Sequence, residues 1–191
     1  MLTLYDSHDS SNAIKVRFLL AELGLDYVAV EVPLYPKPAW YAELHPFNLI
    51  PTLVDGDLTV TESNTALRYL ADREGRDDLY PREAARRARI DMLLDSLSLE
   101  VRPALWAAEE PVVYGLPSDV DWRPALDQAL TGYERLIAGD GYAAGDFSIA
   151  DCAIGGRMQY IGQLPIELGR YPRLARVLAL TFARPGYQAA V

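Results

Sequence analysis

The chain has 191 residues, of which 50% are hydrophobic and 24% charged, as expected for a globular protein of one large or two modest domains. Its formal net charge of −9 argues against nucleic-acid binding, because contacts to phosphates require clustered Lys and Arg side chains. The single cysteine, Cys152, excludes an internal disulfide and a cysteine-rich metal site, and His8 and His45 are too far apart in the sequence to form a metal motif.

The first 75 residues show strand and helix patterns in alternation. Gly24 ends an amphipathic helical pattern, and Asp55-Gly56 is a dipeptide typical of a tight hairpin turn between two short strands. The expected order is βαβαββα, with strands over 2–5, 27–32, 52–54 and 58–60 and helices over 12–23, 40–44 and 63–73.

Only helical periodicity follows the polar segment around Gly75. Ser148 and Asp151 have the spacing of a capping box, which predicts a helix start there, and Gly155-Gly156 in the same helix predicts close helix packing. We expect Cys152 to be a buried, small apolar residue. The expected helices cover 84–108, as one helix or as two joined near Pro103, and 122–137, 149–160 and 171–184.

The most informative segment is 45–66, where an Ile50-Pro51 step enters the hairpin and Glu62-Ser63 opens a helix. Proline has no N–H and tolerates a cis bond, so Ile50 can offer its backbone groups to an extended peptide. The free N–H groups and the positive dipole end of the following helix favour a carboxylate. Together they predict a site for a small anionic peptide.

Several motifs occur in the order found in one family. They are 10–17 and 21–27 around the first helix, His45-Pro46, Ile50-Pro51-Thr52-Leu53, Glu62-Ser63, the 148–151 cap and Ala183-Arg184-Pro185. On these residues the whole chain resembles the glutathione S-transferase family, in particular its serine-type bacterial or zeta-like members. The resemblance implies an α/β thioredoxin-like domain over 1–75 that binds glutathione, followed by an all-α domain over 82–191.

The resemblance also implies roles for individual residues. Ser10 is the first choice as donor to the glutathione sulfur and Asn12 the second, although Ser10, Ser11 and Asn12 are also good caps for the helix that begins there. Glu62 and Ser63 would hold the γ-glutamyl end and the Ile50 backbone beside Pro51 the cysteinyl residue. Lys37 or His45 would bind the glycyl carboxylate.

Three functions remain open at this level. The first is a glutathione transferase that activates the thiol for attack on a small hydrophobic electrophile, as in detoxification. The second is a glutathione-dependent disulfide or peroxide reductase that relies on Asn12. The third is a non-enzymatic binding or regulatory protein, a hypothesis that Leu49 would permit because relatives often carry a polar residue there.

The second substrate is expected in a cleft against the helical domain, for which Met92, Leu93, Leu97, Leu105 and Trp106 are candidate linings. The family implies a homodimer formed through the 63–73 helix and the long helix after Glu83. No apolar stretch is long enough to span a membrane, and the first residues contain no export segment, so we expect a cytoplasmic protein without a membrane or metal partner.

Overall fold

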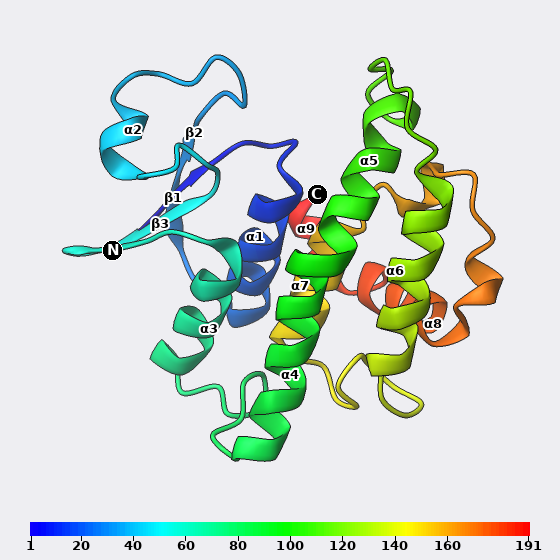
Figure 1. Cartoon of the computed structure of the whole chain (residues 1–191). Helices are drawn as coiled ribbons and strands as arrows, with labels where there is room; N and C mark the ends of the chain where they lie inside the picture. Colours follow the sequence, from blue (N-terminus) through cyan, green and yellow to red (C-terminus); the bar gives the residue numbers. More distant parts are fainter.

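A four-stranded sheet with helices packed against it forms the N-terminal part of this computed structural model, which describes residues 1–191 (Figure 1). Its elements are β1 Leu2–Asp6, α1 Ser11–Leu23, β2 Tyr27–Glu31, α2 Tyr41–Leu44, β3 Thr52–Asp55, β4 Leu58–Val60 and α3 Ser63–Arg73. The strand order is β2-β1-β3-β4. β1 pairs with β2 in parallel and with β3 antiparallel, and β3 pairs antiparallel with β4. The predicted βαβαββα order is therefore confirmed.

Two glycines set the local geometry of this part. Gly24 ends α1 in the left-handed region, with φ 64°, and its N–H donates to the last turn of the helix. Gly56 has φ 58° in the turn between β3 and β4. Residues with a Cβ rarely adopt this conformation, which is why both positions could be read from the sequence as chain reversals.

The second part of the chain is all-helical, as predicted. Figure 1 shows α4 and α5 running along one side of the helical part beside α6. The elements are α4 Ala84–Ser96, η1 Leu97–Val101, α5 Arg102–Val112, α6 Arg123–Leu136, α7 Ile149–Arg157, η2 Ile161–Gln163, η3 Leu168–Arg170, α8 Pro172–Phe182 and α9 Pro185–Ala190. None of these helices has the length and apolar run that crossing a membrane requires.

The expected helix over 84–108 is interrupted by one turn of π-helix, η1. Pro103 has no N–H, so the carbonyl of Leu99 lacks its partner four residues on. The N–H of Arg102 instead donates to the carbonyl of Leu97, five residues back. Such turns are frequent at functional sites because they change the direction of neighbouring side chains.

The C-terminal end differs from the sequence prediction. The helix expected over 171–184 ends at Phe182, and Pro185 starts the additional helix α9, where proline fits because the first helical N–H needs no partner. α9 packs against α1, and Arg17 Nε donates to the carbonyl of Ala190 at 2.7 Å. The expected 149–160 helix likewise ends earlier, at Arg157.

α7 occupies the centre of the molecule, and all of its residues are buried. Its capping box is present: Asp151 Oδ2 accepts from the N–H of Ser148, and Oδ1 accepts from the N–H of Ala143, both at 2.9 Å. A Cβ at Gly156 would lie 2.8 Å from the carbonyl oxygen of Ser11, which explains the predicted close packing. Cys152 is buried and free, as expected.

One hydrophobic cluster of 43 buried residues runs from the sheet through α1 to the C-terminal helices. It includes Leu4 of β1 and Phe18 of α1 together with Ile154 of α7. The N-terminal sheet and the helical part therefore share a core, which holds the start of α1 against α7. The domain limits at 75 and 82 stay a prediction; they fall between the end of α3 and the start of α4.

Candidate functional site

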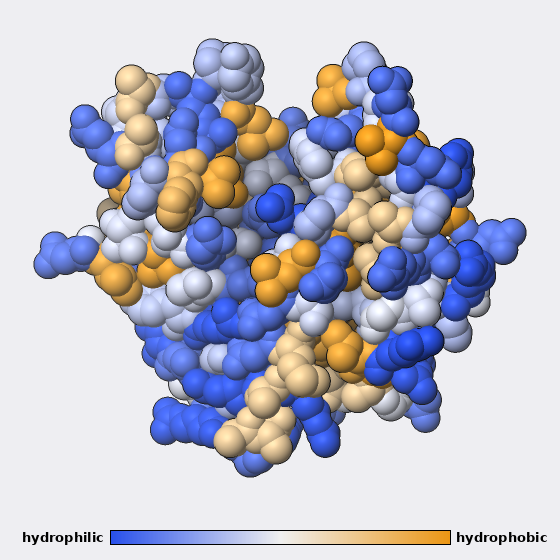
Figure 2. Space-filling view, viewed as in Figure 1, coloured by the Kyte–Doolittle hydropathy of each residue, from blue (hydrophilic) through white to orange (hydrophobic).

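A cleft of about 330 Å³ lies between the start of α3 and the η1–α5 junction. Figure 2 shows the surface hollowed between the α2 side and the α5 side of the molecule. This volume is in the range of small-molecule sites. Six of the eight site residues predicted from the sequence line the cleft, and the helical part adds three more. The six are Asn12, His45, Ile50, Pro51, Glu62 and Ser63, and the three are Ser98, Leu99 and Arg102.

The start of α1 brings polar groups to one end of this cleft. Asn12 lines it, and the side-chain Oδ1 of Asn12 is buried without a hydrogen-bond partner in the protein. The N–H groups of Ser11 and Asn12 precede the first intrahelical bond, which the N–H of Ala13 makes to the carbonyl of Ser10. A buried polar atom without a partner is rare in folded proteins, so a ligand group is expected beside Asn12.

Ser10 occupies the N-cap of α1. Its Oγ accepts from the N–H of Ala13 at 3.3 Å, and only 8% of the residue is exposed. Ser10 is not among the residues that line the cleft. The structure thus gives Ser10 the capping role that competed with catalysis in the sequence, while the hydroxyl proton remains free to be donated.

Ile50 and Pro51 form the edge of the cleft that the sequence suggested. The peptide bond between them is cis, and Pro51 precedes the first residue of β3. The N–H and C=O of Ile50 make no backbone hydrogen bond within the chain. The N–H of Ile50 can therefore donate one hydrogen bond to an extended ligand, and its C=O can accept one.

The start of α3 also borders the cleft. Glu62 has a φ of 66°, which is costly for a residue with a Cβ, and it lines the cleft. Ser63 is buried, and its Oγ accepts from Lys15 Nζ at 3.4 Å. The first intrahelical bond is made by the N–H of Ala66, so the preceding N–H groups remain free for an anion.

His45 and Lys37 have different environments. His45 lines the cleft and is buried, its Nδ1 accepts from the N–H of Phe47 at 3.2 Å, and burial lowers the pKa of its imidazole. Lys37 does not line the cleft, because its Nζ donates to the carbonyl of Leu34 at 2.9 Å. Of the two residues predicted to bind the glycyl carboxylate, only His45 borders the site.

A larger cavity of about 900 Å³ lies elsewhere, between the η1–α5 segment and α6. It contains none of the eight predicted site residues, and its walls include Ala104, Gln128 and Tyr133. Size alone would select this cavity, but the polar groups without partners converge on the smaller cleft.

Comparisons with known proteins identify the family of this chain. Residues 4–78 match the family model for the glutathione S-transferase N-terminal domain. Glutathione S-transferase 3 of Zea mays is 33% identical over 78% of this chain and 73% of its own, and glutathione S-transferase F10 of Arabidopsis thaliana is 31% identical over 80% and 77%. The theta-class glutathione S-transferase of Xanthomonas axonopodis pv. citri, solved with glutathione bound, matches over 100% of this chain and 96% of its own, at 29% identity and a TM-score of 0.84.

The chain belongs to the glutathione S-transferase family.

This membership confirms the fold and the transferase hypothesis, and no finding favours the glutathione-dependent reductase or the non-enzymatic binder. The predicted linings for a second substrate need correction. Leu93, Leu97 and Leu105 are buried in the core, since apolar residues at helical spacing pack inward. The remaining two, Met92 and Trp106, are half-exposed.

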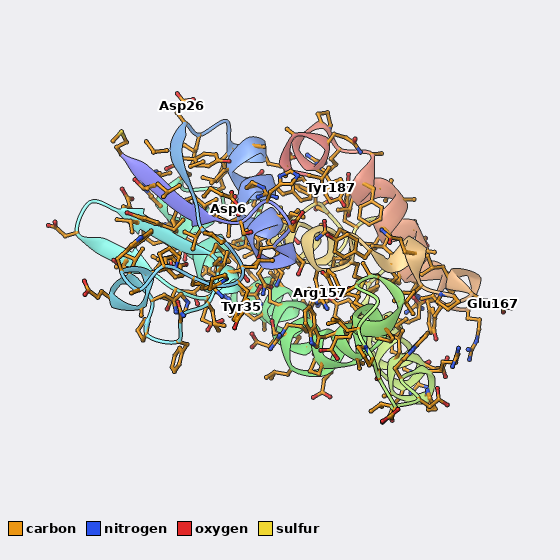
Figure 3. All side chains as sticks on the ribbon, turned by 90° about the horizontal axis from the view of Figure 1, so that it is seen from above. Asp6, Asp26, Tyr35, Arg157, Glu167 and Tyr187 are labelled. Atoms are coloured by element: carbon orange, nitrogen blue, oxygen red, sulfur yellow. The ribbon has the colours of Figure 1, made fainter.

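Three charged residues of this glutathione S-transferase were missed from the sequence. Lys15 is buried behind Ser63, Arg102 lines the cleft, and Arg157 forms a buried ion pair with Glu109. Figure 3 shows Arg157 between the N-terminal sheet and the C-terminal helices. No local motif signals these positions, because each depends on contacts between distant segments.

Proposed function

We propose that this transferase binds glutathione in the cleft between α3 and the η1–α5 junction and activates its thiol at the start of α1. One observation carries the proposal: side chains from three separate segments of the sequence, predicted as glutathione-binding residues, line the same cleft. Chance placement would not gather Asn12, Ile50 and Glu62 around one small volume.

The γ-glutamyl end would lie at the start of α3. The exposed carboxylate of Glu62 suits the ligand's ammonium group, while the hydroxyl of Ser63 and the free N–H groups of α3 suit its carboxylate. The free N–H and C=O of Ile50 would pair with the cysteinyl residue. His45 would face the glycyl end, since it borders the cleft beside Leu49.

The thiol would then reach the start of α1. A free thiol has a pKa near 8.5, and lowering it by about 2 units requires about 2.7 kcal/mol of preferential stabilisation of the thiolate. The side-chain NH2 group of Asn12, its backbone N–H and the positive end of the helix would be the donors, since Asn12 lines the cleft and its N–H precedes the first intrahelical bond. Asn12 is therefore the main donor in this proposal, with Ser10 as the residue that shapes the helix start.

The electrophile would bind on the helical side. Trp106 and Tyr114 of this side are 44% and 42% exposed, and their ring centroids are 5.6 Å apart. Tyr160 stands edge-on to Tyr114 at 6.0 Å. These half-exposed rings suit a small hydrophobic electrophile better than the buried leucines of α4 and α5. All three rings offer apolar surface, and the two tyrosines add hydroxyl groups.

We also propose a homodimer in the cytoplasm. The outer face of α4 carries Met92, which is 50% exposed, and Leu99 of η1, which is 71% exposed. Both residues border the same surface groove, and exposed apolar residues grouped in this way suit an interface between two copies. The single free cysteine and the need for reduced glutathione fit a reducing compartment.

Conjugation of glutathione with a generic aryl halide tests the function. The variant Asn12→Ala is expected to lower kcat/KM at least ten-fold, since a ten-fold loss corresponds to about 1.4 kcal/mol of transition-state stabilisation. Ser10→Ala should have the smaller effect, and Gln163→Ala, which truncates an exposed amide, should have none. Equal activity of the Asn12→Ala and Gln163→Ala proteins would contradict the assigned role.

A further inference from the structure

Lys15 is a lysine of α1 that the structure buries almost completely, with 1% of the residue exposed. Its Nζ donates to Ser63 Oγ at 3.4 Å and to Asn64 Oδ1 at 3.5 Å. Ser63 and Asn64 are the first residues of α3, and both line the glutathione cleft. The amine therefore lies directly behind the residues that would receive the γ-glutamyl carboxylate.

No carboxylate forms an ion pair with this buried amine. The charged groups that face it come from three elements: Arg157 of α7 and Arg102 of α5 repel its positive charge, and Glu62 at the cap of α3 attracts it. Burial and the two guanidinium groups lower the pKa of Lys15 to about 7. Buried lysines normally have a counter-charge, so this position lacks an anion.

The packing shows that the position is built around the lysine stem. A Cβ at Gly156 of α7 would lie 2.7 Å from both Cγ and the backbone nitrogen of Lys15. α7 therefore approaches α1 closely enough to fix the side chain, and the Lys15 stem extends toward Ser63 and Asn64. Packing holds the amine inside the protein, and an anion at the start of α3 would supply the counter-charge that stabilises its protonated form.

We propose that Lys15 supplies the counter-charge for the carboxylate that binds at the start of α3, and that binding is coupled to uptake of one proton by Lys15 Nζ. The inference rests on the proposed function and concerns the same site. In this step the neutral amine of Lys15 takes one proton from the solvent and becomes an ammonium group, while the ligand keeps its carboxylate. Ser63 and Asn64 then lie between two opposite charges, which strengthens their contacts.

Isothermal titration calorimetry with S-methylglutathione tests this coupling. The thioether has no ionisable thiol, so release of a thiol proton cannot mask uptake by the protein. Binding is measured at pH 8.5 in HEPPS and in Tris, which both buffer at this pH and add no phosphate to compete for the anion site, and the dependence of the enthalpy on the ionisation enthalpy of the buffer gives the number of protons taken up. For the natural protein we expect about one proton more than for Lys15→Arg, because a guanidinium is always charged.

Two further measurements complete the test. Lys15→Arg should still bind the ligand, whereas Lys15→Met should bind at least ten-fold more weakly and show the same low proton uptake as Lys15→Arg. The ligand's own amino group and the imidazole of His45 are present in all three proteins, so the difference between variants isolates Lys15. Without any variant, proton uptake by the natural protein should decrease as the pH is lowered to 6, where Lys15 is already charged.

The possible failures are distinguishable. Tight binding with equal proton uptake by the natural protein and Lys15→Arg, or uptake that does not change between pH 8.5 and 6, would overturn the role of Lys15 and leave the glutathione site in place. Absence of binding by the natural protein at millimolar ligand would overturn the proposed function and this inference with it.

Discussion

Arg157 and Glu109 form an ion pair in which the two side chains are only 3% and 1% exposed, with Nη2 and Oε2 2.8 Å apart. Arg157 Nη1 also donates to Ser11 Oγ at 3.3 Å. The pair therefore connects α7 and α5 to the first residue of α1. Because α1 begins beside the proposed thiol site, this buried contact aligns the helix start with the helical part of the protein.

Removing one partner of this pair should destabilise the protein strongly. Glu109→Gln leaves the charge of Arg157 buried without a counter-ion, a change that typically costs about 3–5 kcal/mol. Urea denaturation of the natural protein and the variant gives this difference in the free energy of unfolding. The exposed pair between Arg123 and Asp121, 3.4 Å apart, offers a control. Asp121→Asn should change stability by less than about 1 kcal/mol, and an equally small effect of Glu109→Gln would contradict the assigned role.

The buried Lys15 makes a prediction about stability and pH. Burial, with help from Arg157 and Arg102, lowers the pKa of Lys15 from 10.5 to about 7, so between these values the unfolded chain binds a proton that the folded chain does not. This group therefore makes the protein more stable as the pH rises through that window. Lys15→Met removes the free-energy cost of burying a protonated amine, and it should therefore raise Tm more at pH 7 than at pH 10.

Thermal unfolding of the two proteins at both pH values measures this effect. Lys37→Met is the matched control, because Lys37 donates to the carbonyl of Leu34 near the surface. It should change Tm by similar amounts at the two pH values. If Lys15→Met did the same, the amine of Lys15 would have an ordinary pKa in the folded protein.

The proposed dimer can be tested at Met92. This residue is 50% exposed on α4, and Met92→Glu would place a charge in the proposed interface. Sedimentation equilibrium should show a dimer for the natural protein and a shift toward monomer for the variant. Leu180→Glu changes an apolar residue of α8 that is 38% exposed, and it should leave the mass unchanged. A natural protein that sediments as a monomer would exclude the dimer.

Local signals explain how much of the fold could be predicted. Gly24 and Asp55-Gly56 mark chain reversals that require unusual backbone angles, and Ser148 with Asp151 caps a helix through contacts three residues apart. Pro103 suggested a joint in the long helix but not its form, because a π turn depends on how η1 packs against α6. Pro185 indicates the end of the helix expected over 171–184, but in the structure it is the first residue of α9.

The site was only partly predictable for a related reason. Ser10, Ser11 and Asn12 are equivalent in the sequence as possible caps, and which of them faces the cleft depends on how the helical part packs against α1. Lys15 resembles an ordinary solvated helix lysine until α7 and the start of α3 bury it. Contacts between segments about 50 residues or more apart determine both outcomes, and a single sequence contains no pattern for them.

The central claim is that glutathione bound in this cleft is activated as a thiolate at the start of α1. Ultraviolet difference spectroscopy of the glutathione complex against the S-methylglutathione complex, across a pH series, measures the pKa of the bound thiol directly. We predict a value about 2 units below the pKa near 8.5 of a free thiol, and a return toward that value in Asn12→Ala. A bound thiol that titrates like free glutathione in the natural protein would contradict the claim.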